Sequence, residues 1–384
     1  MALTDDLKKL VMDVTREKES PYISIFMGVN PNDTNIQKDK SAYKNLVAQA
    51  QKDFTSQYPK REWDVYQEEF DLIASERSLG RDGFQGMAVI ASKTHIFRYY
   101  LNIQPEDQSY VSDNLYILPI IKDAQYKFDY DMLSIDKAGF KLYRVRDGAL
   151  KLADLPTDAP NDFHKAIIDP LLVDSQTEVH PEHAGNDVYS TRDIQDVPKE
   201  DDLVRYYKAV DLYVRQKFTL VEHVPVVLLG AEDVQDIFRK NTKNGMLESN
   251  IKITRVPSKL DQPTLNRLKD DINAQFAVQS KAQILQELDN ARSGGRETSG
   301  VDNVVQAAVE GRIRQVLIRD NTVEHGVIDL DMNVDTKSKT AAKHNLLNDI
   351  AVVVLAFGGS VHVLTDDEMP IGQSVIGLLR GRAQ

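Results

Sequence analysis

Residues 300–318 read GVDNVVQAAVEGRIRQVLI, and residues 356–364 read AFGGSVHVL. The first stretch predicts a helix over residues 301–310 and a strand over residues 315–320. The second predicts that a helix over residues 341–357 ends at a glycine pair before a strand over residues 360–364. Glycines suit these positions, because a helix-to-strand reversal often needs a left-handed residue. Together with a strand over 326–330 and a terminal segment over 374–380, these patterns predict a C-terminal α/β/α unit.

Upstream of this unit, apolar spacing and turn residues predict two further α/β units. In the first, we expect a strand at 22–29 and two helices at 41–54 and 63–75. Three β-rich runs should follow at 86–91, 95–101 and 115–121. In the second, we expect a three-strand meander at 132–136, 139–146 and 149–152. A helix at 201–218, a strand at 224–229, a helix at 231–240 and a strand at 251–256 should follow it. A helix over 262–291 leads into the C-terminal unit. The chain is therefore predicted to be α/β with three domains, 1–128, 129–260 and 261–384.

The composition restricts the chemistry that is available. Of 384 residues, 41% are hydrophobic and 28% charged, which is typical of a globular protein. There is no cysteine, so disulfides, thiolate metal sites and cysteine nucleophiles are excluded. The net charge of -12 argues against a surface that coats nucleic acid throughout, so any RNA contact needs a local basic patch.

The sequence pattern indicates neither export nor membrane insertion. Residues 1–10 carry Asp5 and Asp6, unlike a basic-then-apolar signal peptide. The longest apolar run, 350–357, is far shorter than the ~20 residues that cross a bilayer. We expect a cytoplasmic protein without a membrane partner.

The C-terminal stretches resemble the last domain of archaeo-eukaryotic peptide-release factors and Pelota. Residues 22–26, YISIF, resemble the first strand of that family's N-terminal domain. Residues 135–143, IDKAGFKLY, resemble the opening hairpin of its RNase H-like middle domain. The order of the three is the same, and bacterial release-factor-like proteins are the group that the chain resembles. The resemblance implies the ribosome as partner, through rRNA and ribosomal proteins, with a translational GTPase as a second partner.

The family's catalytic motif is missing from the corresponding loop. Release factors carry Gly-Gly-Gln on the middle domain, where the Gln orients water at the peptidyl ester. The long polar loop at 174–200 contains no such motif, and Gly294-Gly295-Arg296 lies elsewhere. We therefore expect no catalytic residue, no cofactor and no peptidyl-tRNA hydrolysis. The resemblance then implies a factor that binds the ribosomal A site in rescue, hibernation or stress.

Candidate ribosome- or RNA-binding residues fall into four groups. Residues 34–38, TNIQK, resemble the Asn-Ile-Lys-Ser tip of eukaryotic release factors, and they open a lysine-rich stretch. The long loop contributes histidines and an arginine, and further cations lie in the middle and last domains. The complete set is Asn35, Lys38, Lys40, Lys44, His180, His183, Arg192, Arg239, Lys240, Arg312 and Arg314. Pro181 separates the two histidines and disfavours a continuous helix, so we expect no metal there.

Two other functions stay open. One is a metal-dependent RNA hydrolase that uses Asp131 and Asp136, with His180 or His183. The other is a non-ribosomal stress interaction protein, which the acidic net charge favours.

Overall fold

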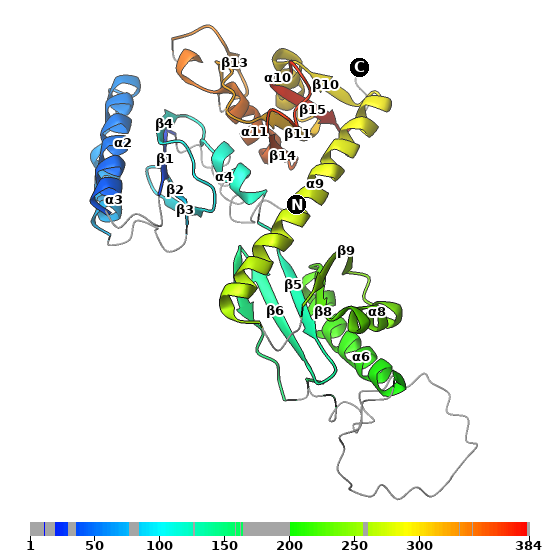
Figure 1. Ribbon diagram of the computed structural model, residues 1–384. Coiled ribbons are helices and arrows are strands. Elements are labelled where there is room, and N and C mark those ends of the chain that lie inside the picture. The colour runs from blue at the N-terminus through cyan, green and yellow to red at the C-terminus, as the bar shows by residue number, and fades with distance from the viewer. Residues whose placement is uncertain are drawn as a thin grey trace, which may run out of the picture. The chain divides into compact units, whose positions relative to one another are not determined.

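The computed structural model describes residues 11, 20–29, 36–76, 84–125, 127–157, 159–161, 163, 200–255, 260–329, 331–339 and 341–381 (Figure 1). The predicted α/β class is confirmed, because helices and several sheets alternate along these residues. The chain forms two compact units: unit 1 joins residues 1–126 to 279–384, and unit 2 spans 127–278. The division into three domains and the RNase H-like character of the second stay predictions. Among the described residues, no helix could span a membrane.

The N-terminal part of unit 1 is an antiparallel sheet with two helices on one face. Its strands β1 (Tyr22–Gly28), β2 (Gly86–Ala91), β3 (Ile96–Leu101) and β4 (Gln108–Ser112) are ordered β3-β2-β1-β4. Alternate β1 side chains, such as Ile23 and Ile25, pack against α2 (Ile36–Gln57) and α3 (Asp64–Ser75). Tyr22 and Phe26 point to the opposite face and join a second core.

One predicted element of this part is wrong. The sequence predicts a β-rich run over 115–121, but Leu118–Ala124 forms helix α4. Pro119 lies in the first turn, where its missing N–H and fixed φ are tolerated by a helix. A short apolar run has no clear period, so its sequence favours a buried strand and a buried helix equally.

The C-terminal part of unit 1 is a mixed sheet with helices on both faces. Its strands β10 (Glu297–Ser299), β11 (Ile313–Arg319), β14 (Ser360–Leu364) and β15 (Val375–Leu379) are ordered β10-β15-β11-β14. Helices α10 (Val301–Val309) and α11 (Leu346–Ala356) cover one face. Leu288 and Ala291, from the C-terminal half of α9 (Gln262–Ser293), cover the other. The strand predicted over 326–330 is reduced to β12 (Val327–Ile328), which pairs with β13 (Val334–Asp335), and a short 3-10 turn at Ala341–Lys343 precedes α11.

Buried side-chain amides join the two parts of unit 1. Asn348 of α11 accepts a hydrogen bond from the Ile117 N–H (2.8 Å) and donates to the Leu115 carbonyl (2.7 Å). Asn114 donates to the Ile328 carbonyl at 2.6 Å. The Asn114 side chain and the backbone groups of Leu115 and Ile117 therefore find partners more than 200 residues away in sequence.

Unit 2 is a five-stranded mixed sheet of order β7-β6-β5-β8-β9. The meander β5 (Tyr130–Ile135), β6 (Phe140–Arg146) and β7 (Ala149–Leu152) is antiparallel, whereas β8 (Val226–Gly230) and β9 (Leu247–Thr254) run parallel to β5. One face packs against α6 (Glu200–Val214) and α8 (Glu232–Asn241). A π-helical turn (Arg215–Thr219) and α7 (Leu220–Glu222) continue α6. The other face packs against Leu265, Leu268, Ile272 and Phe276 of α9.

Candidate nucleic-acid interface

The predicted lysines of the first region share helix α2. Lys38 and Lys44 are exposed and Lys40 is half-buried, within the first three turns. Lys40 and Lys44 are one helical turn apart, so their side chains are neighbours. In the described part of the chain, none of the three makes an ion pair, which leaves their ammonium groups available to an anion. Asn35 lies outside the described residues.

The two predicted cations of α8 differ in what they bind. Arg239 is half-buried, and its guanidinium donates to the Glu248 carbonyl (2.8 Å) and the Ile251 carbonyl (3.3 Å). These bonds fasten α8 to β9, so both terminal nitrogens of Arg239 serve the fold. Lys240, the next residue, is exposed at the C-terminal end of the helix. An RNA contact by either residue stays a prediction.

Arg312 and Arg314 flank the first residue of β11. The Arg312 Nε lies 2.5 Å from Glu310 Oε2, and the Arg314 Nη2 lies 3.1 Å from Glu287 Oε2. Exposed pairs of this kind contribute little stability, about 0–1 kcal/mol, so a stronger anion can replace the carboxylate. Both arginines therefore remain candidates.

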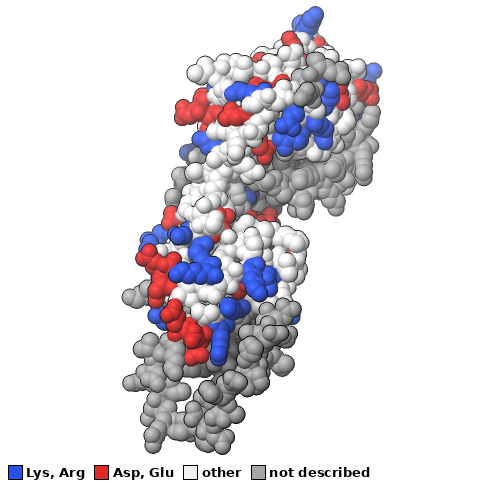
Figure 2. Space-filling view, turned by 90° about the vertical axis from the view of Figure 1, so that its right-hand side faces the viewer, with Lys and Arg blue, Asp and Glu red and all other residues white. Residues whose placement is uncertain are grey.

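The predicted residues lie on separate elements. The lysines are on helix α2 and Arg312 and Arg314 are at the start of β11, both in unit 1, whereas Arg239 and Lys240 are on α8 in unit 2. His180, His183 and Arg192 lie outside the described residues, as does the loop 174–200 up to its last residue. Within the described ranges, no three His, Asp or Glu side chains are grouped as a metal site would require. On the face shown in Figure 2, blue Lys and Arg side chains lie among red Asp and Glu side chains.

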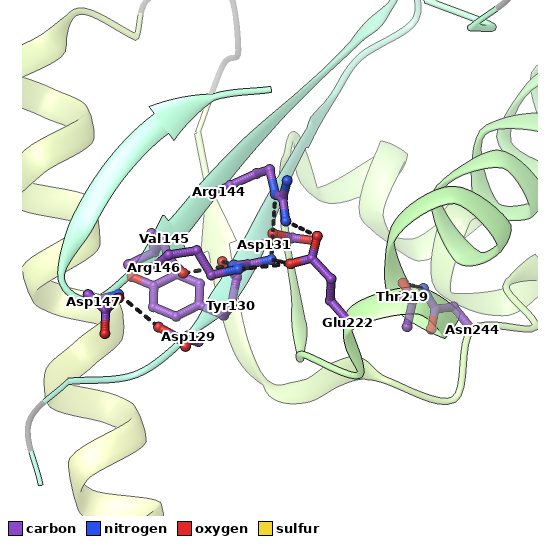
Figure 3. A network of polar contacts seen from close by, with 10 residues as sticks. All are labelled: Asp129, Tyr130, Asp131, Arg144, Val145, Arg146, Asp147, Thr219, Glu222 and Asn244. Atoms are coloured by element: carbon purple, nitrogen blue, oxygen red, sulfur yellow. Dashed lines mark hydrogen bonds and ion pairs between the residues drawn. The ribbon is translucent and has the colours of Figure 1, made fainter. Parts of the chain in front are cut away.

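Sequence reasoning missed a polar network at one end of the unit 2 sheet (Figure 3). The carboxylate of Asp131 on β5 is fully buried, and Arg146 on β6 donates to its Oδ1 at 2.8 Å. The same Nη2 lies 2.7 Å from Glu222 Oε2 on α7. Arg144 pairs with Glu222 and lies 3.7 Å from Asp131 Oδ1. Two carboxylates and two guanidiniums thus balance each other and hold β5, β6 and α7 together.

The network perturbs its carboxylates in opposite directions. Burial raises the pKa of Asp131, although Arg146 and Arg144 oppose the shift. Burial also acts to raise the pKa of Glu222, but hydrogen bonds from Arg146 and Arg144 prevail and lower it. Arg144 additionally stacks over the Phe218 ring at 5.7 Å from its centroid. Each charged group of the network has a partner of opposite sign, so the network acts as a clamp between β5, β6 and α7. The Oδ2 atom of Asp131 is buried and has no hydrogen-bond partner among the described residues.

This geometry bears on the nuclease alternative. Asp131 and Asp136 are five positions apart along β5 and the turn after it, which separates them by ~16 Å and turns them to opposite faces. Asp136 accepts hydrogen bonds from the N–H groups of Ala138 and Gly139, at 2.8 and 2.9 Å, in the β5–β6 turn. The two carboxylates therefore do not share a metal site, for which metal–metal distances of about 4 Å are needed.

Comparisons with known proteins give one family match and several similar solved structures. Residues 128–275 match the family model of bacterial archaeo-eukaryotic release factor family 6. None of the curated proteins compared with the chain matches it. Among solved structures, an archaeal translation termination factor, aRF1, is 11% identical over 98% of this chain and 97% of that chain, with a TM-score of 0.24.

Two Pelota structures are also similar. Archaeal Pelota from a ribosome-bound complex with ABCE1 is 11% identical over 76% of this chain and 72% of that chain, with a TM-score of 0.38. Archaeoglobus fulgidus Pelota is 12% identical over 78% of this chain and 80% of that chain, with a TM-score of 0.33.

Proposed function

We propose that this chain, which carries the sequence of a bacterial archaeo-eukaryotic release factor family in residues 128–275, is a translation factor that binds the ribosomal A site. The family match is the observation that carries the proposal. The match includes residues 135–143, for which the sequence predicts the same resemblance, whereas residues 300–318 and 356–364 lie outside the matched range. The cellular setting that we propose is ribosome rescue, hibernation or stress.

We further propose that the chain does not hydrolyse peptidyl-tRNA. Its 384 residues contain no Gly-Gly-Gln, so the glutamine that would orient water at the ester is missing. Nothing in the clamp around Asp131 replaces it, since both of its carboxylates are paired with arginine. The factor would act by occupying the ribosomal A site.

The proposed ribosome contacts are Lys38, Lys40 and Lys44 of α2, and His180, His183 and Arg192 of the long loop. The lysines have no carboxylate partner among the described residues, which supports a role in binding phosphate. A translational GTPase is a further proposed partner, as the family resemblance implies.

Co-sedimentation with 70S ribosomes at near-physiological salt tests the proposal. We expect stoichiometric binding when the A site is vacant and loss of binding when a tRNA occupies it. The K38Q/K44Q variant removes two exposed charges of α2 and should weaken binding. The matched control K52Q/K60Q removes two exposed lysines from the other end of the helix and the turn after it, and should bind like the wild type.

Two outcomes would overturn the proposal. Absence of binding even at low salt would contradict ribosome association and favour a non-ribosomal interaction protein. Release of peptide from stalled complexes would contradict the proposed lack of hydrolysis. RNA cleavage that requires Mg²⁺ or Mn²⁺ and stops with EDTA would instead support the nuclease alternative.

A further inference from the structure

Three arginines lie side by side at one end of the C-terminal sheet. Arg296 precedes β10, Arg380 follows β15 and Arg312 precedes β11. The Leu379 N–H donates to the Arg296 carbonyl at 2.8 Å, and the Arg380 N–H donates to the Arg312 carbonyl at 2.9 Å. The three residues therefore occupy neighbouring strands, which lie ~4.8 Å apart.

A β-bulge adds a fourth arginine. The pairing of β11 with β15 shifts register between Ile313 and Gln315, so Arg314 is the extra residue. Bulges redirect side chains at sheet ends. The Arg314 side chain is 52% exposed. We call Arg296, Arg312, Arg314 and Arg380 the arginine edge.

An exposed aromatic ring borders the arginine edge. Phe357, at the end of α11, is 44% exposed. The Arg380 guanidinium donates to the Phe357 carbonyl (2.6 Å) and to the Gly311 carbonyl (3.2 Å), which holds it at the backbone of both residues. Gly311 has φ 67°, and a Cβ there would lie 3.3 Å from Phe357 Cδ1. Glycine thus allows both the turn and the close packing of the ring.

The arginine edge is only partly neutralised. Arg312 and Arg314 pair with the exposed carboxylate of Glu310 and the half-buried carboxylate of Glu287. Arg296 and Arg380 have no carboxylate partner among the residues with described positions. Guanidinium groups bind phosphate through paired N–H donors, and they keep their charge at any physiological pH.

We infer that the arginine edge binds single-stranded RNA, with the guanidiniums on successive phosphates and a base stacked on Phe357. Proteins that bind single strands combine a cationic track with aromatic rings on which bases stack. An acidic peptide would use the charges, but it would leave the exposed ring without a planar partner. The inference deepens the proposed function and rests on it for the identity of the RNA, which would be ribosomal.

Fluorescence anisotropy with a short labelled oligouridine tests the inference without a ribosome. R296Q/R314Q removes one exposed ion pair, that of Arg314 with Glu287, and leaves the bonds of Arg380 in place, so the fold should persist. We expect at least about tenfold weaker binding, and a slope of log K against log salt that is smaller by about 1.4, because each phosphate contact on a single strand contributes about 0.7. The control K52Q/K60Q has the same net charge and should keep wild-type affinity and slope.

A second variant separates stacking from charge. F357L keeps an apolar side chain of similar size but removes the planar ring. We expect about five- to tenfold weaker RNA binding with an unchanged salt slope. If F357L and R296Q/R314Q lost RNA affinity equally, and both reduced the slope of log K against log salt, the result would contradict a stacking role for Phe357.

The results also distinguish this inference from the proposed function. Wild-type RNA affinity in R296Q/R314Q would overturn the inference, whatever the ribosome experiment gives. If the same variant instead loses affinity for an oligoglutamate peptide, the edge recognises protein and the inference is also overturned. RNA binding that depends on the edge, in a protein that fails to co-sediment with ribosomes, would support the edge and overturn only the proposed function.

Discussion

The two units secure their buried polar groups in different ways. In unit 2, the charge of Asp131 is balanced by arginines that are about a quarter to a third exposed. In unit 1, the amides of Asn114 and Asn348 satisfy backbone groups of a distant segment, and Asn348 also donates to the neighbouring carboxyl of Asp349. The first arrangement depends on paired charges of which the arginines are partly exposed, and the second depends on donors and acceptors that are buried. The four changes below test this difference.

The largest effect is expected from N348A. The substitution removes the partners of the Ile117 N–H and the Leu115 carbonyl, and each buried unsatisfied group costs about 1–3 kcal/mol. We expect the free energy of unfolding to fall by about 2–6 kcal/mol. Urea denaturation measures the loss, and hydrogen exchange should accelerate at residues 115–117. In the control N303A, an exposed amide is removed from α10, and less than about 1 kcal/mol should be lost.

The next effect concerns pH and Asp349 of α11. Burial raises the pKa of this carboxyl to about 7. Between about pH 4 and pH 7 the folded state therefore holds a proton that the unfolded state has released, so stability falls as pH rises through this range. The loss should amount to about 2–4 kcal/mol and should be missing in D349N.

Denaturation of the wild type and of D349N across this range measures the effect. His362 acts in the opposite sense, because burial lowers its pKa to about 4, but it does so in both proteins. The difference between the two curves therefore isolates Asp349. Parallel curves would show that the carboxyl is not perturbed.

A smaller loss is expected from R146M in unit 2. The change leaves Asp131 buried beside a single arginine, 3.7 Å away. Breaking a buried pair costs about 3–5 kcal/mol, and partial exposure of Arg146 reduces this to about 2–3 kcal/mol. Hydrogen exchange should increase in β5 and β6 and stay unchanged in unit 1. A loss below that of N303A would mean that water already screens Asp131.

The smallest effect is expected from E222Q. Glu222 is one-third exposed, so its pairs with Arg144 and Arg146 contribute at most about 1 kcal/mol. Because the pKa of Glu222 is lowered, this contribution is present above pH 4.5 and is lost as pH falls through the lowered pKa. Denaturation of E222Q and the wild type over a series of decreasing pH values should therefore show a difference at pH 7 that shrinks as Glu222 becomes protonated. A difference that does not depend on pH would contradict an electrostatic origin.

Much of the fold is predictable because its signals are local. The predicted strand at 22–29 and helix at 262–291 agree with β1 and α9 within a few residues, since each has its own apolar period and turn residues. Helix α4 escapes prediction because its apolar run is too short to show a period. The packing of the N-terminal part of unit 1 against its C-terminal part is not predictable from the sequence either. The hydrogen bonds of Asn114 and Asn348 that join these parts link residues more than 200 positions apart.

The site is less predictable than the fold. Lys38 and Lys44 are exposed, as expected of contact residues, but Arg239 uses its donors on two carbonyls that only the fold brings near. The sequence marks Asp131 as a carboxylate, yet its chemistry is set by Arg146 and by Glu222, which lies 76 residues beyond Arg146. A sequence shows a residue's type and spacing, whereas its charge state depends on such distant neighbours.

The division of the chain also has a consequence for synthesis. Unit 2 is one continuous segment, whereas unit 1 is made from the two ends of the chain. Gln125 exchanges two hydrogen bonds with the backbone of Val363, 238 residues later. A nascent chain leaves the ribosome from its N-terminus and folds in complete parts as they emerge. Unit 2 can therefore finish folding during translation, while the core that Tyr22 and Phe26 join is completed only when the last hundred or so residues arrive.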